Sequence, residues 1–139
     1  DAAFKINGTP DAYIVRGASF RYKGLDIRMS SQVYGTEEKD KPAAMGWMTK
    51  ALAEFNKFIE LKPNDHRGYQ KRGEHYFDLW NAFSDGTYLK DALADLDKAI
   101  SLSPQNAEVF YSRSLVHGAM GNNANATADR AKYNELSKR

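Results

Sequence analysis

The stretch ELKPNDHRGYQKRGEHYF, residues 60–77, has a second version 41 residues later, SLSPQNAEVFYSRSLVHG, residues 101–118. In both, an apolar helix end is followed by proline and polar residues, then by an aromatic residue, an arginine, a small residue and a second ring. Proline cannot continue the hydrogen-bond ladder of the preceding helix. The side chains of Asn64, Asp65 and Asn106 can accept hydrogen bonds from the free amides of the next helix. The chain is therefore predicted to repeat one helical unit.

The composition predicts one globular domain over residues 1–139. The chain has 42% hydrophobic residues and a formal net charge of +2, which gives little overall field to attract nucleic acid or an anionic membrane. It contains no cysteine, which excludes disulfides, thiolate metal sites and cysteine nucleophiles. No apolar run approaches the roughly 20 residues of a membrane span. We therefore expect no nucleic-acid partner and no membrane span.

The first residues, DAAFKINGTP, lack Met and the basic and apolar regions of a signal peptide. We interpret a start at Asp1 as that of a mature exported protein of the bacterial periplasm, with a cytoplasmic protein as the alternative. The stretches Asn7-Gly8-Thr9 and Asn125-Ala126-Thr127 match the glycosylation pattern. We interpret them as a turn and a helix start instead.

Apolar residues three and four apart dominate the chain, as in KALAEFNKFIEL, residues 50–61, and LKDALADLDKAISL, residues 89–102. No alternating strand pattern persists, so the fold class is predicted to be all-α. Pro42 fits a first helical position, which leaves GTEEKDK, residues 35–41, as a loop. We predict six helices in three antiparallel hairpins, over residues 10–31, 42–61, 65–83, 87–102, 106–120 and 123–137.

The chain resembles the tetratricopeptide repeat family, whose first helices carry an aromatic residue, a large-small pair and a second aromatic residue. The corresponding residues here are Tyr13, Arg16, Gly17 and Phe20; Tyr69, Arg72, Gly73 and Tyr76; and Phe110, Arg113, Ser114 and His117. Two second helices also fit, through Ala51, Phe55, Phe58 and Pro63 and through Ala92, Leu96, Ala99 and Pro104, whereas Ala126, Arg130 and Tyr133 fit poorly. The resemblance implies a right-handed superhelical stack of three hairpins, a solenoid with repeats at about 10–63, 64–104 and 105–137.

Small residues at Gly17, Gly73 and Ser114 are predicted to let the helices of each hairpin approach closely. Two hairpins exceed the family period of about 34 residues. Gly17 and Gly73 are 56 residues apart, and Pro63 and Pro104 are 41 apart. We predict that both excesses lengthen the helical arms, by about three turns per arm in the first hairpin and about one in the second. A flexible loop in the first hairpin stays open as an alternative.

Residue patterns predict no catalytic site, no metal site and no cofactor. The three histidines, His66, His75 and His117, lack partners at ligand spacing. The aspartates of DALADLD, residues 91–97, lack the spacing of a calcium loop, and we interpret them as a solvated helix face. The recurrent Arg16, Arg72 and Arg113 are expected to pack their stems on apolar surface, with binding of an acidic segment as the alternative.

The resemblance implies a non-catalytic scaffold that binds a peptide or helix of a partner protein in a concave groove. Carried over to this chain, the expected partner-binding residues are Ile14, Ala18, Arg21, Arg67, Gln70, Glu74, Phe77, Tyr111 and Leu115. The alternative is a structural protein that forms homo-oligomers through the first hairpin. Its contact patch would contain Met45, Trp47 and Met48, unless these residues fill the interior of the hairpin. RNA binding is the least favoured function, because the net charge is small.

Overall fold

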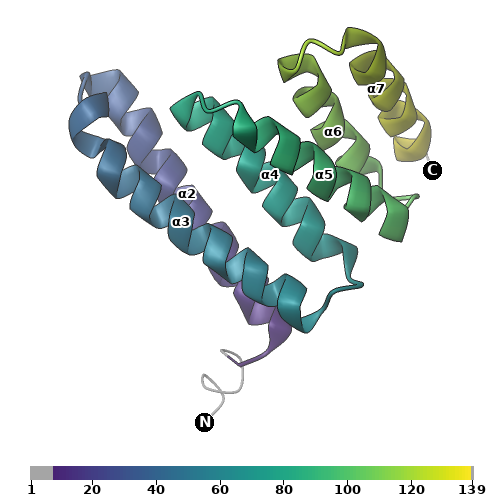
Figure 1. Ribbon diagram of the computed structural model, residues 1–139, viewed down its shortest axis with the longest axis horizontal. Coiled ribbons are helices and arrows are strands. Elements are labelled where there is room, and N and C mark those ends of the chain that lie inside the picture. The colour runs from purple at the N-terminus through teal and green to yellow at the C-terminus, as the bar shows by residue number, and fades with distance from the viewer. Residues whose placement is uncertain (1–7, 139) are drawn as a thin grey trace. The chain divides into compact units, whose positions relative to one another are not determined.

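The computed structural model describes residues 8–138, and within them it contains six α-helices and no strand (Figure 1). This confirms the all-α fold class. The helices are α2 (Pro10–Tyr34), α3 (Glu37–Leu61), α4 (His66–Phe83), α5 (Thr87–Leu102), α6 (Ala107–Ala119) and α7 (Asn123–Ser137). Asp1 and Asn7, on which the expectations of export and of a turn depend, lie outside the described residues. No helix in the described part is long and apolar enough to cross a bilayer.

The residues fall into two compact units, and the boundary lies between Pro63 and Asn64, where the second repeat was predicted to begin. The first unit contains the α2–α3 hairpin. The second contains the α4–α5 and α6–α7 hairpins. Each unit has its own packing.

Small residues along one side of α2 let α3 approach closely in the first unit. Gly17, Gly24 and Ser31 follow one another at intervals of seven residues and all are buried. A Cβ atom at Gly17 would lie 2.5 Å from Cε1 of Phe55, and one at Gly24 would lie 2.5 Å from Cγ of Met48. The predicted close approach at Gly17 is confirmed, and it continues along the lengthened arm.

The first hairpin is lengthened by helix and has no long loop. Gly35 adopts a left-handed conformation, with φ 68°, and the Thr36 amide donates to the Ser31 carbonyl. These two features end α2 directly after Tyr34. The next helix, α3, begins at Glu37, so the expected loop over 35–41 and the expected start at Pro42 were wrong. Glu37, Glu38 and Asp40 lie in the first turn, where negative charge stabilises a helix.

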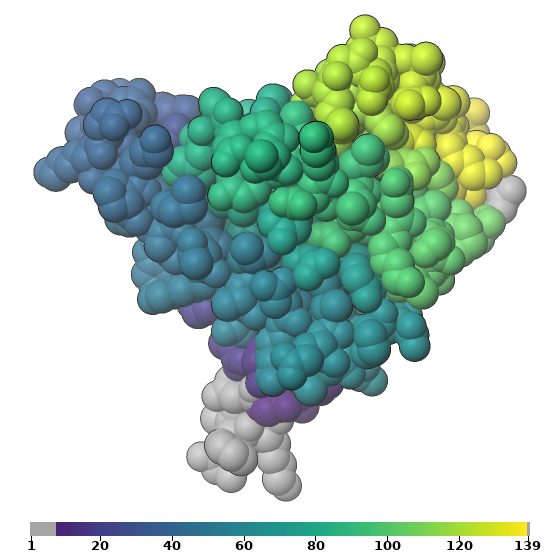
Figure 2. Space-filling view, in the orientation of Figure 1, coloured from purple at the N-terminus to yellow at the C-terminus, as the bar shows by residue number. Residues whose placement is uncertain are grey.

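The second unit has one core to which both of its hairpins contribute. Leu89, Leu96, Val109 and Val116, from α5 and α6, are all at most 7% exposed. Two hydrogen bonds join α4 to the start and middle of the next hairpin, from Asn106 Nδ2 to Gln70 Oε1 at 2.8 Å and from Ser112 Oγ to Glu74 Oε2 at 2.7 Å. Figure 2 shows the side chains of α5, α6 and α7, in green to yellow, as one continuous surface.

The helix starts of the second unit follow the sequence in one case and depart from it in another. The Asp65 carboxylate accepts a hydrogen bond from the Arg67 amide at 3.0 Å, which caps α4 as expected. The hydrogen bond from the Arg67 side chain holds the pKa of Asp65 below its usual range. Asn106 lies at the start of α6, but its side chain makes no capping hydrogen bond to that helix, and its Nδ2 donates to Gln70 instead. The expected cap at Asn106 was therefore wrong.

Candidate partner-binding site

Each of the three hairpins is closed by an arginine that pairs with an acid on its second helix. Arg16 Nε lies 3.0 Å from Glu54 Oε2 in the first hairpin. Two guanidinium nitrogens of Arg72 donate to Asp95 at 2.8 and 2.7 Å. Arg113 donates to Asp129 in the same way, at 2.8 Å for both bonds. Each arginine therefore pairs with an acid of its own hairpin, which accounts for the recurrence, and Arg113 Nη1 also donates to Asp97 of α5 at 2.9 Å.

The Arg72–Asp95 pair is the most enclosed of the three, with side chains 23% and 8% exposed. Burial raises the pKa of Asp95, and the bonds from Arg72 oppose that rise. The same bonds raise the pKa of Arg72, so the guanidinium stays charged. The expectation that the aspartates of 91–97 form a solvated face was wrong for Asp95, which is 6% exposed. A matching signal was present in the sequence, since Glu54, Asp95 and Asp129 each precede the large residue of a second helix.

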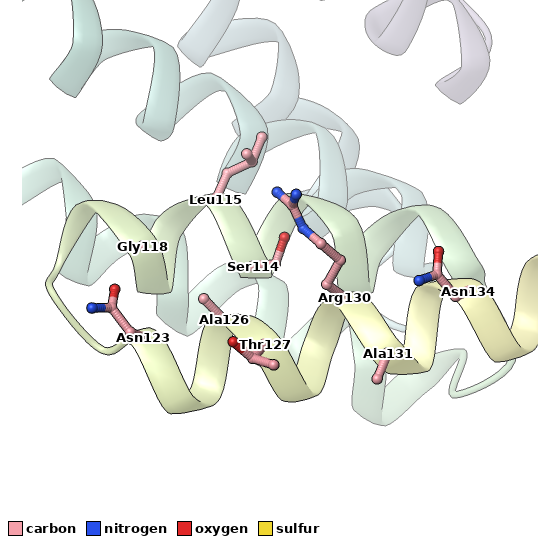
Figure 3. A pocket seen from close by; sticks show the side chains of 9 residues that line it. All are labelled: Ser114, Leu115, Gly118, Asn123, Ala126, Thr127, Arg130, Ala131 and Asn134. Carbon is pink, nitrogen blue, oxygen red and sulfur yellow. The ribbon is translucent and has the colours of Figure 1, made fainter.

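The third hairpin keeps the ion pair but lacks the apolar side chain that fills the crossing in the other two. Ser114 is buried, as predicted, and Arg130 takes the position that Phe55 and Leu96 hold in the other hairpins. An open hollow of about 620 Å³ remains between α6 and α7. Figure 3 shows the Arg130 side chain pointing from α7 toward α6. The lining residues are Ser114, Leu115, Gly118, Asn123, Ala126, Thr127, Arg130, Ala131 and Asn134.

The hollow lies on the face of the third hairpin that is equivalent to the α4–α5 face against which α6 packs in the second hairpin. When Asp95 is aligned with Asp129, four apolar residues of α5 take the places of polar residues in α7. They are Leu89, Leu93, Leu96 and Ile100, where α7 has Asn123, Thr127, Arg130 and Asn134. The α5 residues belong to the core shared with α6 or pack against it. The polar replacements remove the apolar surface that a further hairpin would need for stacking, as expected for a capping helix.

An aromatic cluster borders the hollow. The rings of Tyr111 and Tyr133 lie 5.3 Å apart, and the Arg130 guanidinium carbon lies 5.7 Å from the centroid of Tyr111. Tyr111 is 42% exposed, which makes it the most exposed large hydrophobic residue that the structure describes in the second unit. The face therefore combines amides and a cation with an exposed tyrosine and a half-buried leucine, and it can make both polar and apolar contacts.

The arrangement of helices was compared with known proteins. The solved structure of TTC0263, a thermophilic TPR protein of Thermus thermophilus, matches this chain with a TM-score of 0.62 and 19% sequence identity. The match covers 85% of this chain and 75% of that chain. The chain has the tetratricopeptide repeat fold. No protein-family model and no curated protein sequence matches it.

The tetratricopeptide repeat, or TPR, fold confirms the solenoid of helical hairpins that the resemblance implied. At this level of identity the similarity concerns the fold, and the site has to be argued from this chain. Within residues 8–138, no three His, Asp or Glu side chains gather closely enough to hold a metal ion.

Four residues of α4 that the TPR pattern places in a groove make contacts within the second unit. Gln70 is 4% exposed and bonds to Asn106, so its predicted place on an open surface was wrong. Glu74 accepts from Ser112. Arg67 pairs with Asp65 at 2.8 Å, and the Phe77 ring lies 5.4 Å from that of Trp80. Of the expected residues, the half-buried Leu115 lines the hollow, and the exposed Tyr111 contacts Arg130 at its border.

The expected residues of the first unit divide in a similar way. Ile14, Ala18 and Arg21 are half-buried on one face of α2, and their part in binding stays a prediction. Met48 is fully buried, so it cannot belong to an exposed patch. The Trp47 ring lies 5.6 Å from Phe20 and carries the ammonium groups of Lys23 and Lys50 at 4.3 and 4.5 Å. With the half-buried Met45, the expected contact patch mostly fills or covers its own hairpin.

The sequence pattern missed a different exposed surface on α2. Five large apolar side chains there are 64–79% exposed, namely Val15, Tyr22, Met29, Val33 and Tyr34. The intervals of seven, seven and four residues between the first four of them were visible in the sequence. They were obscured because α2 carries a second apolar face at the same period, through which it contacts α3.

Proposed function

We propose that this protein is a non-catalytic interaction scaffold that binds a helix or extended segment of a partner protein along α6 and α7. The observation that carries the proposal is the open hollow of the third hairpin, which stands where the second hairpin receives a helix of its own chain. A TPR fold supplies such surfaces between consecutive helices. The partner segment would take the place that α6 takes on α4 and α5.

The lining of the hollow defines the chemistry of that segment. Leu115 in the lining and the Tyr111 ring at its border offer apolar contact, and Asn123 and Asn134 offer amide donors and acceptors. Arg130 is exposed beside them and favours a carboxylate. An amphipathic segment with one acidic side chain on its polar face fits this combination.

A peptide selection tests this proposal without knowledge of the natural partner. A random peptide library displayed on phage is panned on the immobilised chain, and the enriched peptides are measured against the parent and against Leu115→Asp. We expect Leu115→Asp to weaken binding about tenfold or more, as for a central contact residue. Leu61→Asp is the matched control, since Leu61 is 44% exposed and lies on α3.

Two results would contradict the site. One is the absence of any enriched peptide. The other is a set of peptides that bind Leu115→Asp and the parent equally. Circular dichroism of each variant shows whether the helices are kept, which separates a lost contact from a lost fold.

A further inference from the structure

The helix α2 carries an exposed stripe on the side away from α3. We call it the outer stripe and define it by Val15, Ser19, Tyr22, Asp26, Met29 and Val33, which follow one another at intervals of four and three residues. The four large apolar members are 64%, 69%, 67% and 78% exposed. The stripe spans about 27 Å along the helix.

The outer stripe lies nearly opposite the contact with α3. Each stripe residue lies two positions after a residue that faces α3; Ser19, for example, comes two after Gly17, and Asp26 two after Gly24. Two residues correspond to a rotation of about 200° around the helix axis. The helix α2 is therefore apolar on two opposite faces, of which one is packed. Intervals of four and three sustained over several turns are the pattern by which two helices pack along a seam.

The third hairpin of another copy does not suit the outer stripe. Its open face carries Asn123, Thr127, Arg130 and Asn134 where the second hairpin carries apolar residues. Valine and methionine side chains placed on that face would bury amide and guanidinium groups without partners, at a cost. A head-to-tail contact between copies is therefore disfavoured.

The outer stripe is complementary to a second copy of itself that runs in the antiparallel direction. When two copies of α2 run antiparallel about Gly24, Val15 of one copy meets Val33 of the other, and Ser19 meets Met29. Tyr22 meets Asp26, so the phenol can donate to the carboxylate on both sides of the two-fold axis. A parallel pair would instead set Asp26 against Asp26, two like charges in contact, which is unfavourable.

We propose that two copies of this protein associate through the outer stripes of α2, antiparallel and related by a two-fold axis. A self-complementary patch of this kind gives a closed dimer, the commonest symmetric assembly. The contact is short, so the dimer should be reversible and dependent on concentration. This assembly goes beyond the proposed function and uses a different surface, so either proposal can fail alone.

Sedimentation velocity of the full chain over a dilution series tests the association. We expect a monomer–dimer equilibrium, and we expect Tyr22→Arg to raise its dissociation constant about tenfold or more. Leu61→Arg is the matched control, because Leu61 is also an exposed large apolar residue and lies on α3, outside the stripe. A chain that stays monomeric at every concentration, or a dimer that Tyr22→Arg leaves unchanged, would overturn the proposal.

Single cysteines test the antiparallel direction, since the chain has none of its own. A mixture of Ser19→Cys and Met29→Cys should form a disulfide-linked dimer faster than either variant does alone. Linking of Ser19→Cys to itself as fast as in the mixture would overturn the antiparallel pairing. Circular dichroism verifies that each variant keeps its helices. We expect the helices to be kept because Ser19 and Met29 are both exposed.

Discussion

The first and third hairpins fill the same position of the repeat in opposite ways. In the first, a glycine on α2 receives the buried Phe55 ring so closely that a single added carbon would overlap it. In the third, a serine faces the exposed Arg130 across an open hollow. The arginine–acid pair is kept in both, so a hairpin of this fold can close by its ion pair and helix ends while its crossing is left for other contacts.

The largest expected difference between the two hairpins comes from truncating the side chain at that position. Phe55→Ala should lower the free energy of unfolding by about 3–5 kcal/mol, because it leaves a cavity in the first unit. Arg130→Ala should lower it by less than about 1 kcal/mol, because that side chain is exposed. Urea unfolding followed by circular dichroism measures both. Similar losses from the two variants would mean that the third hairpin also depends on its crossing.

The ion pairs should differ with their burial. Asp95→Ala removes the carboxylate that pairs with the half-buried Arg72 and should cost about 3 kcal/mol. Glu54→Ala breaks a pair whose side chains are 33% and 21% exposed, and it should cost about 1 kcal/mol or less. The same unfolding measurement decides the order. A larger loss for Glu54→Ala would show that exposure does not set the strength of these pairs.

Two glycines of the first unit should respond with opposite signs. Gly17→Ala gains about 1 kcal/mol of helix propensity, but its overlap with Phe55 costs about 1–3 kcal/mol, so we expect a net loss of about 1 kcal/mol. Gly46→Ala places a methyl group in open space on α3 and should stabilise by up to about 1 kcal/mol. Thermal unfolding midpoints report both effects. Stabilisation by Gly17→Ala would refute the tight crossing.

Sequence patterns predicted the helices well because their signals are local. The bounds of α5 and α7 agree with the predicted 87–102 and 123–137, where Asp85-Gly86 and Gly121-Asn122 interrupt the chain just before each helix. The start of α3 was missed because Pro42 suggested a first position, although the acids before it already favoured a first turn.

The site was predicted less well because it depends on which residues meet across hairpins. Asp95 and Asp97 are two positions apart on α5, yet Asp95 is buried against Arg72 of its own hairpin, whereas Asp97 is 54% exposed and pairs with Arg113 of the next hairpin. Gln70 likewise looks like a surface residue until Asn106 from the next hairpin covers it. Tyr111 and Leu115 came from the family pattern, and their part in binding stays a prediction.

The lengthening of the first hairpin by whole helical turns has a consequence for how such proteins change in evolution. Its helices of 25 residues extend about 37 Å, against about 20 Å for the 13 residues of α6, and only Gly35 and Thr36 connect them. Added turns at this distal end leave Arg16, Gly17 and Phe55 in register. Insertions and deletions can therefore accumulate there in matched pairs, one turn on each arm, while the base of the module is inherited unchanged.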